Sequence, residues 1–102
     1  MFTPETTESA DRDLDGITDY IGRHLGNPEA ALALLDEVDA VRETLETNPY
    51  AYPLCSDAHL ADLGYHKAVM KAYIAVFEID DAAKVARILR YFHSSENYAN
   101  KL

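Results

Sequence analysis

The feature that most constrains this chain is a segment near its C-terminus, residues 64–93, in which three short runs favour β-strands. The runs cover residues 65–71, 73–79 and 84–92, and the last two are rich in β-branched and aromatic side chains. Between them, the Asp-Asp-Ala-Ala sequence at residues 80–83 is short enough only for an antiparallel hairpin. The segment therefore predicts an antiparallel three-strand meander.

The N-terminal half predicts two amphipathic helices joined by a tight turn. Ser9 is a candidate N-cap for the first helix, which Gly26 is expected to end. Asn27 is a candidate N-cap for the second helix, with Pro28 at its first position and its end near residue 46. The apolar stripe of the second helix consists of Ala31, Leu34, Leu35, Val38, Val41 and Leu45. Leu32 falls outside this stripe and is a candidate surface contact.

Three flanking segments carry weaker signals. Residues 2–7 predict a short edge strand, because Pro4 has no N–H to donate within a sheet. Residues 47–62 contain two prolines and show no clear period, so we expect a linker between the helices and the meander. Ser94 or Ser95 is expected to cap a final short helical turn.

The burial requirements of these elements define the fold class. Each helix has one apolar stripe and the meander has at least one apolar face, so packing one layer on the other buries both. Residues 1–102 are therefore expected to form a single α+β domain of two layers. In this domain an N-terminal helical hairpin packs on a small antiparallel sheet, in the order β-α-α-β-β-β with a short C-terminal helix.

The net charge of the chain is unevenly distributed. The formal charge is −9, and residues 1–48 contain twelve acidic and three basic residues, whereas residues 49–102 contain six of each. An acidic protein attracts a nucleic acid poorly over long range, because phosphate binding depends on Lys and Arg. The neutral C-terminal half still permits a local cationic site.

Nothing in the sequence points to export, a membrane or a metal. The first residues lack the apolar run of a signal peptide, and no run approaches the ~20 apolar residues of a membrane span. Cys55 is the only cysteine, which excludes an internal disulfide and fits a reducing compartment. The four histidines do not have the spacing of zinc ligands. We therefore expect a cytoplasmic protein without a metal, a cofactor or a membrane contact.

Several phrases of the chain occur in an order shared with a known superfamily. They are SADRDLDGITDYI and HLGNPEAALALLDEV in the predicted helices, NPYAYPL in the linker, and then GYHK, KAYIAVFEIDD and VARILRYFHSSENY. In this order the chain resembles the RelE/ParE superfamily of toxins from type II toxin–antitoxin modules. The resemblance implies the fold described above and a cognate antitoxin whose flexible segment wraps the toxin.

Members of this superfamily divide in their action. The resemblance alone does not choose between them. Our leading expectation is a RelE-like toxin, a ribosome-dependent mRNA endonuclease that drives the ribose 2′-OH onto the adjacent phosphate without a metal. Its partners would then be the ribosome and mRNA. The chain has His66, Ile74 and Ser94-Ser95-Glu96 where basic residues recur in RelE-like toxins. A ParE-like inhibitor of DNA gyrase, or an inactivated toxin that only binds its antitoxin, therefore remains an alternative.

The resemblance also implies a set of site residues. Lys67 falls in the basic segment of the first meander strand, and Arg90 and His93 form an R-x-x-H pattern that closes the last strand. An aromatic residue follows at Tyr98. These four are the main candidates, Lys67 and Arg90 for binding phosphate or RNA, and His93 and Tyr98 for proton transfer or base stacking. The sheet half also offers Arg87 and His66 as further candidates for binding phosphate or RNA.

Each of these candidates has an ordinary structural alternative. Lys67 and Arg90 could form salt bridges with acidic residues of the N-terminal half, and Tyr98 could anchor the C-terminal tail. Because successive side chains of a strand point to opposite faces, Arg90 and His93 are expected on opposite faces unless a β-bulge intervenes. By the same rule Arg87 and His93 share one face.

Overall fold

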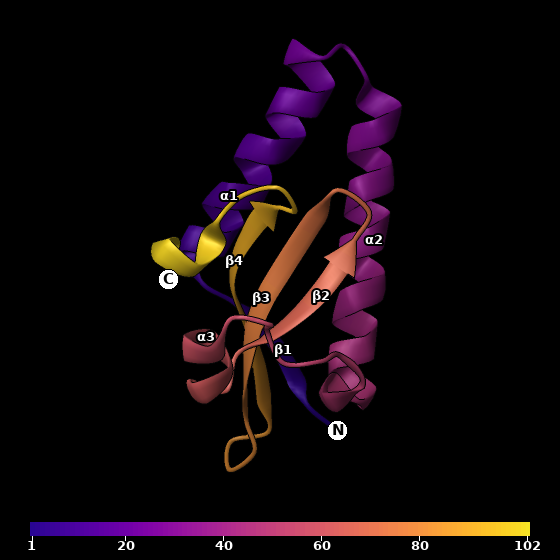
Figure 1. Cartoon of the computed structure of the whole chain (residues 1–102). Helices are drawn as coiled ribbons and strands as arrows, with labels where there is room; N and C mark the ends of the chain where they lie inside the picture. Colours follow the sequence, from indigo (N-terminus) through magenta and orange to yellow (C-terminus); the bar gives the residue numbers. More distant parts are fainter.

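In the computed structural model, which describes all of residues 1–102, a helical hairpin packs against a four-stranded sheet (Figure 1). The main elements are β1 (Thr3–Thr6), α1 (Glu8–Asp19), α2 (Pro28–Thr47), α3 (Ala58–Asp62), β2 (His66–Met70), β3 (Tyr73–Asp80) and β4 (Val85–His93). Shorter helical turns lie at Tyr20–His24, Pro49–Ala51 and Tyr98–Lys101. The predicted α+β class with a β-α-α-β-β-β order is confirmed.

The strand order of the sheet is β1-β4-β3-β2. Strands β2, β3 and β4 pair antiparallel in sequence order, so the predicted meander is confirmed, with bounds within one residue of those expected. Strand β1 pairs parallel to β4 at the opposite edge, from Thr3 beside Val85 to Thr6 beside Ile88. Pro4 thus lies in an edge strand, where its missing N–H removes no bond within the sheet.

The helical hairpin follows the predicted pattern in most respects. Gly26 has a φ of +61° just after the first helical segment, and Asn27 caps α2 by accepting a hydrogen bond from the Ala30 N–H at 3.1 Å. Leu32 is 62 % exposed, as predicted. Leu35, which the sequence places in the apolar stripe, is 36 % exposed, because the buried face of α2 is formed by Ala31, Leu34, Val38, Val41 and Leu45 alone.

Thr7, and not Ser9, caps the first helix. The Thr7 hydroxyl oxygen accepts from the Ala10 N–H at 3.0 Å, and the same hydroxyl donates to the Leu89 carbonyl oxygen at 2.7 Å. Ser9 lies inside the first turn of α1. The cap is therefore also a link between α1 and strand β4, which sequence spacing alone does not specify.

Replacing Thr7 with alanine is expected to lower the free energy of unfolding by about 1–2 kcal/mol, because the helix loses its cap and the Leu89 carbonyl loses its donor. Urea unfolding followed by circular dichroism measures this loss. Thr7→Ser keeps the hydroxyl and should retain most of the stability. An equal loss in both variants would show that the methyl group, and not the hydroxyl, matters.

Apolar side chains cover both faces of the sheet. The larger cluster joins the hairpin to one face and consists of Ala10, Val38, Val41, Leu45, Ala68, Met70, Ala75, Phe77, Ala86, Ile88 and Tyr91. On the other face the cluster consists of Cys55, Leu60, Ile74, Val76 and Phe92. Helix α3 supplies Leu60 to this second cluster, so the segment expected to be only a linker contains a helix that covers the sheet.

The C-terminal turn begins later than expected. It starts at Tyr98, after Asn97, and has no side-chain cap, whereas Ser95 hydrogen-bonds the His93 ring instead. As Figure 1 shows, the tail folds back beside β4, and the two long helices extend beyond the sheet at their connecting loop. None of the helices has the length and apolar character needed to span a membrane.

Candidate functional site

A β-bulge in β4 decides which candidate residues share a face of the sheet. Val76 of β3 pairs with Arg90 and Phe77 pairs with Ile88, so Leu89 has no partner on β3. Paired residues lie on the same face, which places Arg87 and Arg90 together, on the face opposite the hairpin. His93 follows Arg90 without a further bulge and lies on the hairpin face. The predicted separation of Arg90 from His93 is therefore present, but the bulge also separates Arg87 from His93.

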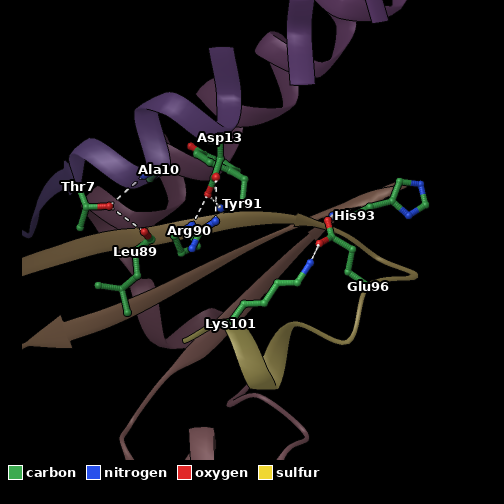
Figure 2. Close-up of polar contacts among 9 residues, drawn as sticks. All are labelled: Thr7, Ala10, Asp13, Leu89, Arg90, Tyr91, His93, Glu96 and Lys101. Atoms are coloured by element: carbon green, nitrogen blue, oxygen red, sulfur yellow. Dashed lines mark hydrogen bonds and ion pairs between the residues drawn. The ribbon is translucent and has the colours of Figure 1, made fainter. Parts of the chain in front are cut away.

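Arg90 is held by an acidic residue of the first helix. Its Nε and Nη2 donate to the two carboxylate oxygens of Asp13, at 2.6 and 3.0 Å (Figure 2). The Tyr91 N–H donates to the same carboxylate at 3.0 Å. The hydrogen bond with Asp13 raises the pKa of Arg90 above its ordinary value, although burial of the guanidinium lowers it. Arg90 is thus a fixed cation whose charge an internal carboxylate neutralises.

Lys67 lies on the same face of the sheet as Arg90, but buried side chains separate the two residues. In register, Lys67 of β2 and Arg90 of β4 both flank Val76 of β3. Val76 is fully buried in the cluster that contains Leu60, so packed side chains lie between the two cations. The Lys67 ammonium donates to the Ser56 hydroxyl at 3.1 Å.

His93 is the most accessible of the candidate catalytic residues. Its ring lies edge-on to Tyr73, with the centroids 5.2 Å apart, at the end of the sheet. Its Nδ1 accepts from the Ser95 N–H at 3.1 Å and lies 2.6 Å from the Ser95 hydroxyl. When the ring is neutral, these contacts place its proton on Nε2. In Figure 2 the imidazole points away from Arg90, so these two residues do not converge on one substrate atom.

His66 and Tyr98 are engaged in packing. The His66 ring is only 9 % exposed, stacks on Phe77 at 5.3 Å, and is within 2.9 Å of the Tyr52 carbonyl through Nδ1. Tyr98 stacks on Phe92 at 5.3 Å with an interplanar angle of 16°, which anchors the tail. Burial raises the pKa of Tyr98, so its hydroxyl is a weaker acid than an ordinary tyrosine.

Most cations of the C-terminal half have an acidic partner. Of the six basic residues after residue 48, four pair with a carboxylate: Lys71 with Glu37, Arg87 with Glu5 and Glu78, Arg90 with Asp13, and Lys101 with Glu96. Lys84 lies over the Phe2 ring at 4.9 Å. The exposed pairs among these contribute little stability, yet all of the pairs lower the local positive potential. No group of three or more His, Cys, Asp or Glu side chains is arranged to bind a metal ion.

A cavity that sequence patterns did not predict opens between the hairpin and the β2–β3 turn. Its volume is about 310 Å³, and seven of its nine lining residues are hydrophobic. The helices supply Ile21 and Leu34, and the turn supplies Met70 and Tyr73. The ion pair of Glu37 with Lys71 lies at this cavity. The cavity forms where the hairpin lies beside the β2–β3 turn. Helical periodicity in the sequence does not show which residues of the hairpin lie beside this turn.

Comparison with known proteins assigns this chain to a family. Residues 5–98 match the family described as ParE toxin of the type II toxin–antitoxin system parDE. The match covers most of the chain, so the protein belongs to the ParE toxin family. It is thus the toxin of a type II toxin–antitoxin module, within the RelE/ParE superfamily. Among curated proteins, no sequence matches this chain.

Solved structures show the same fold. The chain is similar to a protein of the chromosomal ParDE toxin–antitoxin system of P. aeruginosa, with a TM-score of 0.71 and 22 % identity, over 91 % of this chain and 96 % of that one. It is similar to a chain of the RelBE2 toxin–antitoxin complex of Mycobacterium tuberculosis, with a TM-score of 0.62 and 26 % identity, over 93 % of each chain. For YafQ of E. coli the TM-score is 0.55 and the identity 16 %, over 93 % and 96 %.

Proposed function

We propose that this toxin acts by binding a target protein and does not cleave RNA, with DNA gyrase as the target that membership of the ParE family implies. The observation that carries the proposal is the pairing of most cations of the C-terminal half with carboxylates, including both arginines of strand β4. Cleavage at a phosphate needs free cations beside an acid and a base. Here Arg90 is neutralised by Asp13, and His93 lies on the other face.

A ribosome-dependent mRNA endonuclease, the function expected from sequence, is the second candidate. The exposed imidazole of His93, held beside Tyr73 and Ser95, is the observation that favours it. In that case His93 would transfer a proton, and Lys67 would be the only candidate Lys or Arg without a carboxylate partner, because its ammonium donates to a neutral hydroxyl. Tyr98 would contribute only by stacking, because its ring already packs on Phe92.

We further propose that a cognate antitoxin covers apolar surface of the toxin in the cytoplasm. Leu32 and Tyr50 are 62 % and 53 % exposed, and the cavity beside the hairpin is lined mostly by apolar side chains. Tyr52 is half-buried against Phe77 and offers less surface than Tyr50. A complex in which Leu32 and Tyr50 remain as exposed as in the free toxin would contradict this proposal.

Two assays on the purified toxin separate the candidate functions. We expect inhibition of plasmid supercoiling by gyrase, and intact mRNA in primer extension with translating ribosomes. The variants Lys67→Ala and His93→Ala should keep this inhibition within about twofold, because neither side chain would be needed for chemistry. Ribosome-dependent cuts that His93→Ala abolishes would instead establish the endonuclease. Activity in neither assay would indicate a toxin that only binds its antitoxin.

A further inference from the structure

The contact of Asp13 with Arg90 has the form of an occupied anion site. Three N–H groups converge on one carboxylate: Nε and Nη2 of Arg90, and the backbone N–H of Tyr91. Two of them meet at Oδ2 of Asp13 and the third binds Oδ1. A guanidinium fork combined with a backbone N–H is a donor set that binds carboxylate and phosphate oxygens alike.

The fold creates this donor set because β1 is short. Strand β1 stops at Thr6, so the outer edge of β4 beyond Ile88 has no strand beside it. Two side chains from the N-cap and the first half of α1 bind the β4 backbone where a neighbouring strand is missing. The Thr7 hydroxyl donates to the Leu89 carbonyl, and the Asp13 carboxylate accepts from the Tyr91 N–H. Figure 2 shows these contacts following one another along β4.

The β-bulge at Leu89 determines where the Arg90 side chain lies relative to this edge. It turns Arg90 to the face opposite the hairpin, where the guanidinium lies 5.1 Å from the Phe92 ring. From there the side chain reaches the β4 edge and meets Asp13, whose side chain is 17 % exposed. Arg90 and the Tyr91 N–H would therefore present a half-buried, cationic edge if the Asp13 carboxylate were absent.

We propose that Asp13 occupies, within the folded chain, a phosphate-binding site formed by Arg90 and the Tyr91 N–H. Removal of the carboxylate then opens the site to a phosphate oxyanion, which carries the same charge sign and the same acceptor oxygens. In the folded toxin the first helix prevents Arg90 from binding a phosphate group. This inference concerns the site itself and holds for either target of the toxin.

The competing explanation is that Asp13 only fastens α1 to β4. Both explanations predict a loss of stability when Asp13 is replaced, because a cation and a backbone N–H lose their acceptor. Only the proposed site predicts a gain of binding. A titration with phosphate therefore separates them where a stability measurement does not.

The experiment is a titration of inorganic phosphate into ¹⁵N-labelled Asp13→Ala, followed by the signals of the Tyr91 amide and the Arg90 Nε. We expect a saturable shift of both signals, with an affinity at least about tenfold above that of the unmodified toxin. Asp13→Asn should behave in the same direction, because it removes the charge at constant shape. The double variant Asp13→Ala with Arg90→Gln should lose the shift.

The pair of Glu5 with Arg87 provides a matched control. Arg87 donates to Glu5 at 3.2 and 3.3 Å but also pairs with Glu78 at 3.7 Å, and no backbone N–H joins this contact. Glu5→Ala should therefore gain no saturable phosphate binding. A gain equal to that of Asp13→Ala would reduce the effect to general loss of negative charge and overturn the proposal.

A single-stranded oligoribonucleotide added to Asp13→Ala identifies the source of the phosphate. Shifts of the same two signals would assign the site to backbone phosphate, whereas shifts with inorganic phosphate alone would assign it to the free ion. A folded Asp13→Ala without a saturable shift, or a shift that persists without Arg90, would overturn the proposal. Unfolding of both Asp13 variants would also overturn it, because Asp13 would then serve the fold alone.

Discussion

Replacing Phe77 with alanine is expected to lower the free energy of unfolding by about 3–5 kcal/mol. Phe77 is fully buried at the centre of the helix-facing side of the sheet. Its ring stacks on His66 at 5.3 Å and meets the Tyr52 ring edge-on at 5.8 Å. The variant would therefore lose apolar burial and leave a void in contact with both neighbours.

For a domain of this size, such a loss corresponds to a fall in melting temperature of about 15–30 °C. Thermal and urea unfolding, followed by circular dichroism, measure both quantities. Phe77→Leu is the matched control and should cost only about 1–2 kcal/mol, because most of the apolar volume remains. A loss below about 1 kcal/mol for Phe77→Ala would mean that the site collapses around the smaller side chain.

The elements that the sequence predicted well are those with a strong local signal. The meander has β-branched and aromatic runs with short connections, and its three strands match the expected bounds within one residue. Asn27 followed by Pro28 is likewise a local signature, and it begins α2 as expected. In both cases the residues that give the signal lie within the element itself, so no distant partner is needed to predict it.

The differences arise where a distant partner decides the local structure. Thr7 caps α1 in place of Ser9 while it also binds the Leu89 carbonyl in β4, which is far away in the sequence. Helix α3 has only five residues, so it gives little periodicity; its one local signal is Asp57, which accepts from the Leu60 N–H. Such a short helix is stabilised by tertiary packing, here by Leu60, which is fully buried against the sheet.

The candidate site could be predicted as a set of residue types but not as an arrangement. The sequence indicated that Arg90 could bind either a phosphate or an acid of the N-terminal half, and the structure has the second arrangement, with Asp13. The acid could not be identified in advance, because twelve acidic residues precede residue 49. The bulge at Leu89, which sets the faces of Arg87 and Arg90, has no glycine to mark it.

Tyr91 is the buried ionisable group whose environment has the largest effect on its titration. Its side chain is 4 % exposed and its hydroxyl has no hydrogen-bond partner. Burial raises the pKa of Tyr91 to about 12; the charge of Arg42 opposes this rise, and the carboxylates of Asp11, Asp13 and Asp39 add to it. In the unfolded chain the phenol would ionise near its ordinary pKa of 10.0.

Because the folded-state pKa lies above the unfolded-state value, stability from Tyr91 is fully present below pH 10 and is lost as the pH rises to about 12. The expected loss is about 2–3 kcal/mol, measured as the free energy of urea unfolding between pH 9 and pH 12. Tyr91→Phe removes the ionisation, so this variant should lose that much less than the unmodified toxin. Tyr20→Phe, which changes an exposed tyrosine, should leave the alkaline loss in place.

At pH 7, the stability of Tyr91→Phe measures the cost of the buried hydroxyl apart from the packing of the ring. Tyr91→Phe keeps the ring within the helix-face cluster and removes only a buried hydroxyl without a partner. Desolvating such a hydroxyl costs about 1–3 kcal/mol, so the variant should be more stable than the unmodified toxin by about 1 kcal/mol. A less stable Tyr91→Phe would contradict this expectation and show that the hydroxyl has a hydrogen-bond partner in solution.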